Sequence, residues 1–109
     1  MALQNGSKKL DLIDKESYEI MEARDYFIRA VETRPKDPKC HHYYAKFLET
    51  INEFNESEIS YLSALKLNPN SIDTLIDYSN FLNFRNQRDD QLIAQRFLDR
   101  VEKVKSFSN

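Results

Sequence analysis

Apolar side chains recur every three or four residues along this chain, through long charged stretches. That spacing is typical of one face of an α-helix. Proline-containing turns separate the stretches: "PKDP" at 35–38 and "NPNS" at 68–71. Proline cannot extend a helix and disfavours helical geometry in the residue before it. The pattern predicts five helices joined by short turns, over about residues 14–34, 37–51, 55–67, 70–84 and 89–105.

Polar residues that cap helices mark the predicted starts. Asp14 is the expected cap of the first helix, and Asp37 before Pro38 places a cap next to a favoured first helical residue. Asn55 with Glu58 three residues later resembles a capping box. Turns this short make consecutive helices antiparallel neighbours. With one glycine in 109 residues, the chain also lacks the turn residues typical of β-hairpins. We therefore predict an all-α protein.

The sequence repeats itself with a period of 34 residues. "YAKFLE" at 44–49 returns as "YSNFLN" at 78–83, and "FIRAVETRP" at 27–35 returns as "YLSALKLNP" at 61–69. Two separate stretches share one period, which indicates an internal structural repeat. Each copy covers a pair of predicted helices.

This repeat resembles the tetratricopeptide repeat (TPR). Its helix A pattern is a bulky residue, a large–small pair and a large residue; its helix B pattern is small–aromatic–small before a closing proline. The matching positions are His41, Tyr44, Ala45, Leu48, Ser57, Tyr61, Ala64 and Pro69. The family favours glycine where this chain has Ala45 or Ser79. The resemblance covers about residues 15–105 and implies a TPR-like α-solenoid of antiparallel helix-turn-helix repeats.

The array amounts to about two and a half repeats. Residues 15–34 resemble helix B of a preceding repeat that lacks a convincing helix A, and 70–84 resemble helix A of a following one. The last helix fits as its helix B only if the turn at 84–90 carries three extra residues. We expect residues 1–14 to be loosely ordered, 15–105 to form the repeat domain and 106–109 to be a tail.

The repeat positions also predict the core. Small residues should let paired helices approach closely, while large ones fill the space between hairpins. We expect Phe47 and Phe81 to lean on the preceding helix B. The small positions are Ala23, Ala45, Ser57, Ala64 and Ser79; the large ones are Tyr44, Leu48, Tyr61, Tyr78, Leu82 and Leu98.

The resemblance implies a concave groove, lined by the A helices, that binds a peptide or a helix of a partner protein. The plainer alternative for any one of these residues is a solvated surface position. The groove candidates on the first full helix A are Lys39, His42, Tyr43, Lys46, Glu49 and Thr50. Those on the second are Asp73, Ile76, Asp77, Asn80 and Asn83.

The charges of this groove restrict its ligand. Some family members clamp the C-terminal carboxylate of chaperones with basic residues on successive A helices. Here Asp73 and Asp77 stand where basic residues would be needed, and they would repel an acidic tail. The pattern disfavours chaperone tails and favours a partner that carries both signs of charge. Asn80 offers a donor and an acceptor to a ligand backbone.

Composition narrows the class of protein further. The formal net charge is −2, without the dense basic face of most nucleic-acid or membrane-surface proteins. No apolar run approaches the about 18 residues of a membrane span, and the first residues lack the apolar core of a signal peptide. A single cysteine, Cys40, suits a reducing compartment. We expect a cytoplasmic or nuclear protein.

The "CHH" run at 40–42 is the one cluster that suggests a metal or a nucleophile. Neighbours on a helix point about 100° apart, so Cys40, His41 and His42 should not converge on one ion. His41 stands at a core position, where partial burial is its expected role. No glycine-rich phosphate loop is present. We predict a protein without catalytic activity, metal or cofactor.

Two alternatives to peptide binding remain. Basic residues near the C-terminus suggest RNA binding, although aspartates and a glutamate dilute them and a last helical turn favours bases anyway. Self-association is the stronger alternative, since an apolar stripe on the last helix needs a cover. A symmetric homodimer would provide one; packing on Leu75, Tyr78 and Leu82 is the plainer reading. The stripe consists of Ile93, Phe97, Val101 and Val104.

Overall fold

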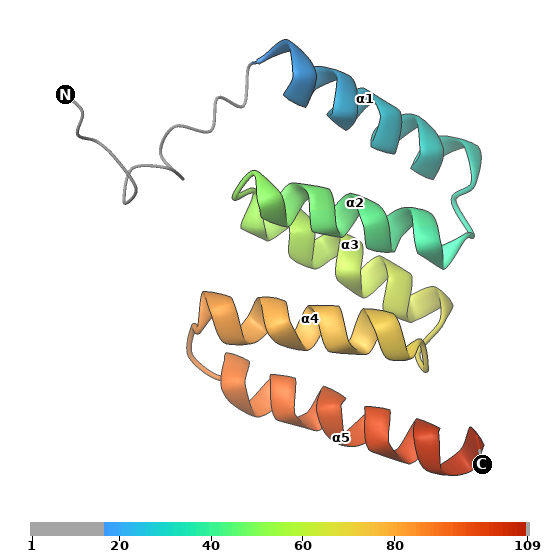
Figure 1. Ribbon diagram of the computed structural model, residues 1–109, viewed down its shortest axis with the longest axis vertical. Helices are drawn as coiled ribbons and strands as arrows, with labels where there is room; N and C mark the ends of the chain where they lie inside the picture. Colours follow the sequence, from blue (N-terminus) through green and yellow to red (C-terminus); the bar gives the residue numbers. More distant parts are fainter. Residues whose placement is uncertain (1–16, 109) are drawn as a thin grey trace, which may run out of the picture.

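The computed structural model describes residues 17–108, which form five α-helices and, over that range, no strand. Consecutive helices run antiparallel and are stacked from α1 to α5 (Figure 1). The predicted all-α fold of five helices is confirmed. The helices are α1 (Tyr18–Thr33), α2 (Pro38–Thr50), α3 (Phe54–Leu67), α4 (Ile72–Arg85) and α5 (Asp90–Ser108).

Side-chain caps start three of these helices. The hydroxyl of Ser17 accepts a hydrogen bond from the backbone N–H of Ile20 at the start of α1. Asp37 caps α2, as the sequence predicted, and Ser71 caps α4 in the same way. These bonds satisfy backbone donors that have no partner inside a helix. The cap predicted at Asp14 lies outside the described residues.

The start of α3 differs from the prediction. Its N-cap residue is Glu53, which makes no capping bond, and Asn55 already lies inside the helix. A capping box formed by Asn55 and Glu58 is therefore wrong. Asn52 turns the chain just before the helix with a φ of 65°, a conformation that asparagine tolerates well. The carboxylate of Glu58 instead accepts hydrogen bonds from Tyr78 and Arg85, both on α4.

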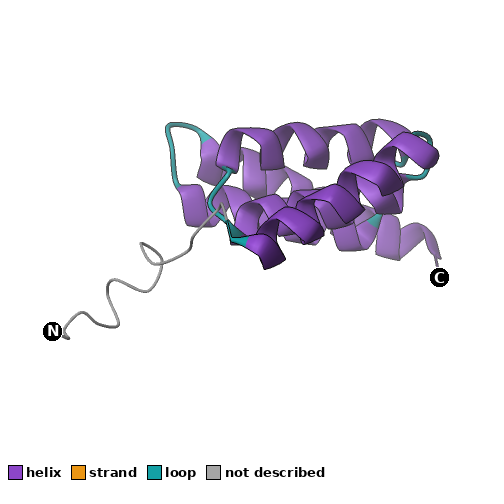
Figure 2. Cartoon of the chain, turned by 90° about the horizontal axis from the view of Figure 1, so that it is seen from above, coloured by secondary structure: helices purple, strands orange, loops and turns teal. Residues whose placement is uncertain are grey.

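The helices pair into two hairpins, α2 with α3 and α4 with α5, while α1 packs on α2 and α3 on α4. Seen from above, the axes of the antiparallel helices are roughly aligned, and the loops lie at the two ends of the stack (Figure 2). The core follows the joint between the hairpins. Its most deeply buried large side chains include Leu48, Tyr61, Leu75, Phe81 and Leu82.

Small residues set the spacing within each hairpin. Ser57 on α3 is fully buried, and its hydroxyl donates to the carbonyl oxygen of Ala45 on α2 at 2.7 Å. In the second hairpin the two residue types are exchanged: Ser79 on α4 donates to its own helix and, at 3.3 Å, to the carbonyl of Ala94 on α5. Each hairpin thus needs one alanine and one serine where its helices meet. A larger side chain would separate them.

The aromatic residues join the two hairpins. Tyr61 of α3 stacks on Tyr78 of α4 with ring centroids 5.4 Å apart, and Phe81 lies 5.5 Å from Tyr61. Likewise Phe47 lies 5.2 Å from Phe27 on the preceding helix. Both predicted contacts with a preceding helix B are confirmed. Tyr44 and Leu98, also expected in the core, are only half-buried, as is the small residue Ala23.

Both core tyrosines keep their hydroxyl groups hydrogen-bonded. Tyr61 donates to Glu49 on α2 at 2.7 Å, and Tyr78 donates to Glu58 on α3 at 2.6 Å. Burial, followed by the neighbouring carboxylate, raises the pKa of each phenol well above its usual value. The hydroxyls therefore remain protonated donors at neutral pH. Each bond links two helices and fixes their register.

Arg85 at the end of α4 ties three helices together. Its guanidinium makes paired hydrogen bonds to Glu58 on α3 and to Asp90 on α5, at 2.9–3.1 Å. It also lies over the ring of Phe81, 5.1 Å from the centroid. The Arg85 side chain is 12% exposed and that of Asp90 is 7% exposed. Hydrogen bonds from Arg85 lower the pKa of both carboxyl groups.

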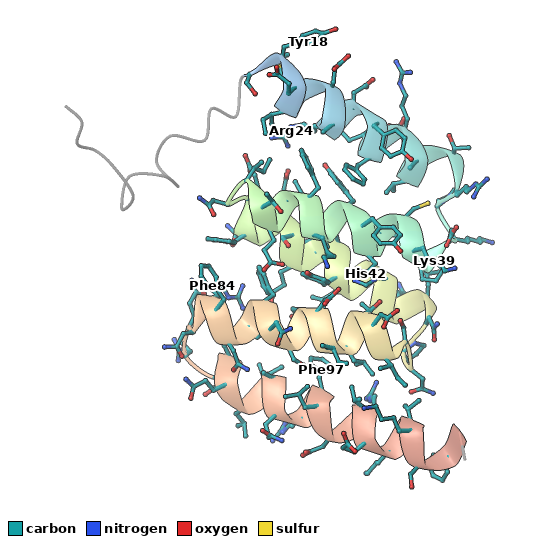
Figure 3. The ribbon with its side chains drawn as sticks, in the orientation of Figure 1. Tyr18, Arg24, Lys39, His42, Phe84 and Phe97 are labelled. Atoms are coloured by element: carbon teal, nitrogen blue, oxygen red, sulfur yellow. The ribbon has the colours of Figure 1, made fainter. Side chains whose placement is uncertain are left out.

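The stripe predicted for self-association mostly faces the protein interior. Phe97 packs against Tyr78 with centroids 5.3 Å apart, between α4 and α5 (Figure 3), and Val101 is 3% exposed. Val104 is half-buried, and only Ile93 is exposed. The tertiary structure therefore places Val101 in the core and packs the partly buried Phe97 against it, in line with the plainer prediction of inward packing.

We predict that Ala45→Leu lowers the free energy of unfolding by about 1–3 kcal/mol, because a larger side chain forces α2 away from α3. Asn80→Leu, on the exposed face of α4, serves as the control and should change it by less than about 0.5 kcal/mol. Urea unfolding followed by circular dichroism measures both. Equal midpoints for the two variants would contradict the close-approach argument.

We also predict that Arg85→Met destabilises the protein by about 3 kcal/mol or more at neutral pH, because two carboxylates lose their buried partner. The folded pKa values of Glu58 and Asp90 lie below their unfolded values. Their stabilisation is thus complete above the unfolded pKa, about 4, and is lost as pH falls through the folded values. The difference between variant and wild type should shrink near pH 3. Arg96→Met, on an exposed part of α5, should show neither effect.

Candidate partner-binding groove

A groove with a volume of about 460 Å³ lies between α1 and α2. Four of its eight lining residues are aromatic, two from each helix, and two of the rings are open to solvent: Tyr26 is 68% exposed and Tyr43 is 56% exposed. We call it the α1–α2 groove. Its lining residues are Tyr26, Phe27, Ala30, Cys40, Tyr43, Lys46, Phe47 and Thr50.

The surface is hollowed beyond both ends of this groove. Toward the end of α1 a further hollow shares Tyr26, Ala30 and Cys40 and adds Arg29, Thr33 and Arg34. Toward the end of α2 another shares Lys46 and Thr50 and adds Glu49, Asn52 and Phe84. One face of α2 therefore borders three adjoining hollows, which we call the depression; their lining passes from arginines, through aromatic rings, to a mixed polar region.

Four of the predicted groove residues border this depression: Tyr43, Lys46, Glu49 and Thr50. Lys39 lies at the exposed start of α2 (Figure 3). Asp73, Asn80 and Asn83 are exposed along α4, and Ile76 and Asp77 are half-buried. The structure thus brings these four α2 candidates together in one surface, while the α4 candidates lie on the neighbouring helix.

His42 is buried, whereas the sequence placed it in the groove. It is 7% exposed and lies between α2 and α4 (Figure 3). One ring nitrogen is 2.7 Å from a carboxylate oxygen of Asp77, and the other is 3.1 Å from the hydroxyl of Thr74. Lys46 also approaches the same Asp77 oxygen, at 3.3 Å. This polar cluster joins the two A helices and holds the face of α2 in place.

Tyr26, Phe27, Cys40 and Phe84 line the depression although none of them was among the predicted groove residues. Phe84 is 65% exposed at the end of α4 (Figure 3). It lies 34 residues after Thr50, a predicted groove residue, so the repeat could have identified it. The other three were assigned to a helix B or to a chemical cluster. Their exposure depends on which helices cover α1, which the one-dimensional pattern does not show.

The Cys-His-His run does not converge on one point. Cys40 lines the groove, a ring nitrogen of His41 lies 2.8 Å from the carbonyl oxygen of Pro35, and His42 faces α4. Within residues 17–108, no group of three or more His, Cys, Asp or Glu side chains is arranged to hold a metal ion. None of the described helices has the length and apolar character needed to cross a bilayer.

Comparisons with known proteins add no family to this description. No protein-family model matches the chain, and searches of curated proteins and of solved structures find no significant match. The candidate site therefore stands on the geometry of the groove.

We predict that the exposed rings of the depression contribute little to folding. Tyr43→Ala and Phe84→Ala should each lower the free energy of unfolding by at most about 1 kcal/mol, because each loses little more than one aromatic contact. Phe81→Ala should cost about 3–5 kcal/mol, because that ring is fully buried. Urea unfolding separates the two classes. A large loss for Tyr43→Ala would give this ring a structural role instead.

Proposed function

We propose that this protein is a non-catalytic interaction module, a scaffold or adaptor that binds a peptide or helix of a partner protein along the open face of α2. The observation that carries this proposal is the α1–α2 groove, in which Tyr26 and Tyr43 expose aromatic surface beside Lys46. Aromatic residues and arginine are enriched among the interface residues that contribute most of the binding free energy.

The resemblance to the TPR family supports the same function. That family presents its A helices to ligands, and here α2 contributes residues to every part of the depression. Hydrogen bonds from the buried His42 to Thr74 and Asp77 fix α2 against α4 and so hold this face in place. A surface held by tertiary contacts is preorganised, which lowers the entropic cost of binding.

The charges favour a protein partner over RNA. Arg85, one of the basic residues that suggested RNA binding, is 12% exposed and paired with two carboxylates. The depression itself carries Lys46 and Glu49 at one end and two arginines at the other. A segment with apolar side chains and charges of both signs would match it.

The test is a selection of displayed random peptides on the wild-type chain. Selected peptides are then measured by fluorescence anisotropy against a Tyr26→Ala, Tyr43→Ala double variant. We expect the dissociation constant to rise at least about tenfold, because the two rings supply most of the apolar contact. The control is Ile59→Ala, a residue 65% exposed on α3, which should leave the constant unchanged.

The double variant replaces two exposed tyrosines by alanine and leaves Asp77 unchanged. A substitution of Asp77 would also remove the hydrogen-bond partner of His42. Circular dichroism establishes that all variants are equally helical. The proposal would be contradicted if no peptide is enriched, or if the wild type and the double tyrosine variant bind the selected peptides with equal affinity. RNA that binds with a steep salt dependence would replace it.

A further inference from the structure

The internal repeat exposes a difference between α1 and α3, which occupy equivalent positions in successive copies. Five residues of α3 are buried: Ser57, Ser60, Tyr61, Ala64 and Leu65. Their counterparts 34 residues earlier are Ala23, Tyr26, Phe27, Ala30 and Val31. All five counterparts are half-buried or exposed, and no residue from Tyr18 to Thr33 is fully buried. The same helical face is covered in one copy and open in the other.

The cover on α3 is α2. Ala45 meets Ser57 at the point of closest approach, and Glu49 accepts the hydrogen bond of Tyr61. On its other side, α2 contacts α4, where Thr74 and Asp77 are the hydrogen-bond partners of His42. The 34-residue counterparts of Tyr61, Thr74 and Asp77 are Phe27, Cys40 and Tyr43, which line the α1–α2 groove. The groove is thus the place that a helix equivalent to α2 would occupy.

We propose that the α1–α2 groove binds an amphipathic helix of a partner protein, which packs on α1 as α2 packs on α3. This inference rests on the proposed function and names its site and the class of its ligand. The bound helix runs antiparallel to α1 and parallel to α2. Helix-in-groove binding of this kind uses apolar anchors spaced three or four residues apart.

The lining residues specify the apolar face of that helix. Where α2 has His42, the partner needs an apolar residue, because Cys40 and Tyr43 stand in place of Thr74 and Asp77, the hydrogen-bond partners of His42. A small residue fits at the position of Ala45, which would face Ala23. A polar group left unpaired in the groove would weaken binding.

The charges specify the first turn of the helix. In the antiparallel orientation its N-terminus lies near the end of α1, where Arg29 and Arg34 line the hollow. The counterparts of these arginines in the second copy are Ser63 and Asn68, so the repeat itself does not require a positive charge here. Arg29 forms an ion pair with Asp25 on its own helix, at 3.1 Å. Acidic residues in the partner's first turn would pair with the arginines and also suit the helix dipole.

The chain's own N-terminal residues do not match this face. In the 34-residue register, the positions of His42, Ala45 and Leu48 correspond to Lys8, Asp11 and Asp14, all charged. The turn at 51–53 corresponds to 17–19, where Ser17 already caps α1 and Tyr18 is helical. The composition of this segment thus favours a partner supplied by another molecule.

Cys40 provides the readout, because it lies in the groove and is the only cysteine of the chain. The probe is a designed 13-residue peptide, the length of α2. It carries glutamates in its first turn, leucines at the positions of His42, Leu48 and Glu49, and alanine at that of Ala45. We expect it to slow the reaction of the Cys40 thiol with a disulfide reagent at least about tenfold at saturation.

Two variants and a control test the site. Ala30→Glu, which places a charge in the groove, should weaken peptide binding at least about tenfold, whereas Leu62→Glu on α3 should not. Arg34→Glu should also weaken it, and a peptide with lysines in its first turn should recover the loss. Arg34 is exposed, so this variant is expected to fold even if Ala30→Glu does not.

The remaining outcomes overturn the inference in distinguishable ways. If selected peptides bind the tyrosine face but the helical peptide leaves Cys40 reactive, the inference fails and the proposed function stands. If no peptide of any kind binds, both fail. Faster Cys40 labelling in a full-length Leu10→Asp, Ile13→Asp variant would show that the chain covers its own groove. Concentration-dependent protection without peptide would identify a second copy as the occupant.

Discussion

The close contact between one alanine and one serine in each hairpin sets the geometry on which the other contacts depend. Ser57 against Ala45 and Ser79 against Ala94 bring two backbones together through a hydroxyl–carbonyl bond. Only small side chains permit this approach. Because the helices of each hairpin lie close together, the aromatic rings between the hairpins can pack directly on one another. The spacing within the hairpins therefore determines the packing between them.

Polar contacts then decide how the hairpins are oriented. Arg85 joins α3, α4 and α5 through two carboxylates, and His42 joins α2 to α4 through Asp77. These bonds are directional, unlike apolar packing, so they select one arrangement among several that would bury similar surface. The face of α2 that borders the depression is held from behind by this arrangement. The proposed binding surface is thus a consequence of the core.

The repeat also explains why one face remains open. The helix α3 packs against α2 on one side and α4 on the other, whereas α1 packs on α2 and, within residues 17–108, has no neighbour equivalent to α2. Repeat arrays draw stability from contacts between adjacent units, so an uncovered unit has surface available for a partner. A partner helix bound in the α1–α2 groove, as proposed, would extend the array by one helix. A ligand of that kind would stabilise α1 together with the groove.

The sequence by itself determined the five helices, the two hairpins and most of the core, because helical periodicity, prolines and the 34-residue repeat are local or directly visible in the chain. Tyr43 and Lys46 were also placed correctly on the exposed face of α2. Only the tertiary structure decided that His42 is buried, that Glu58 binds Arg85 rather than capping α3, and that Phe97 faces inward. Those outcomes depend on which distant helix lies opposite each residue. The sequence pattern assigns a residue to a face of its helix, but the folded chain decides whether another helix covers that face.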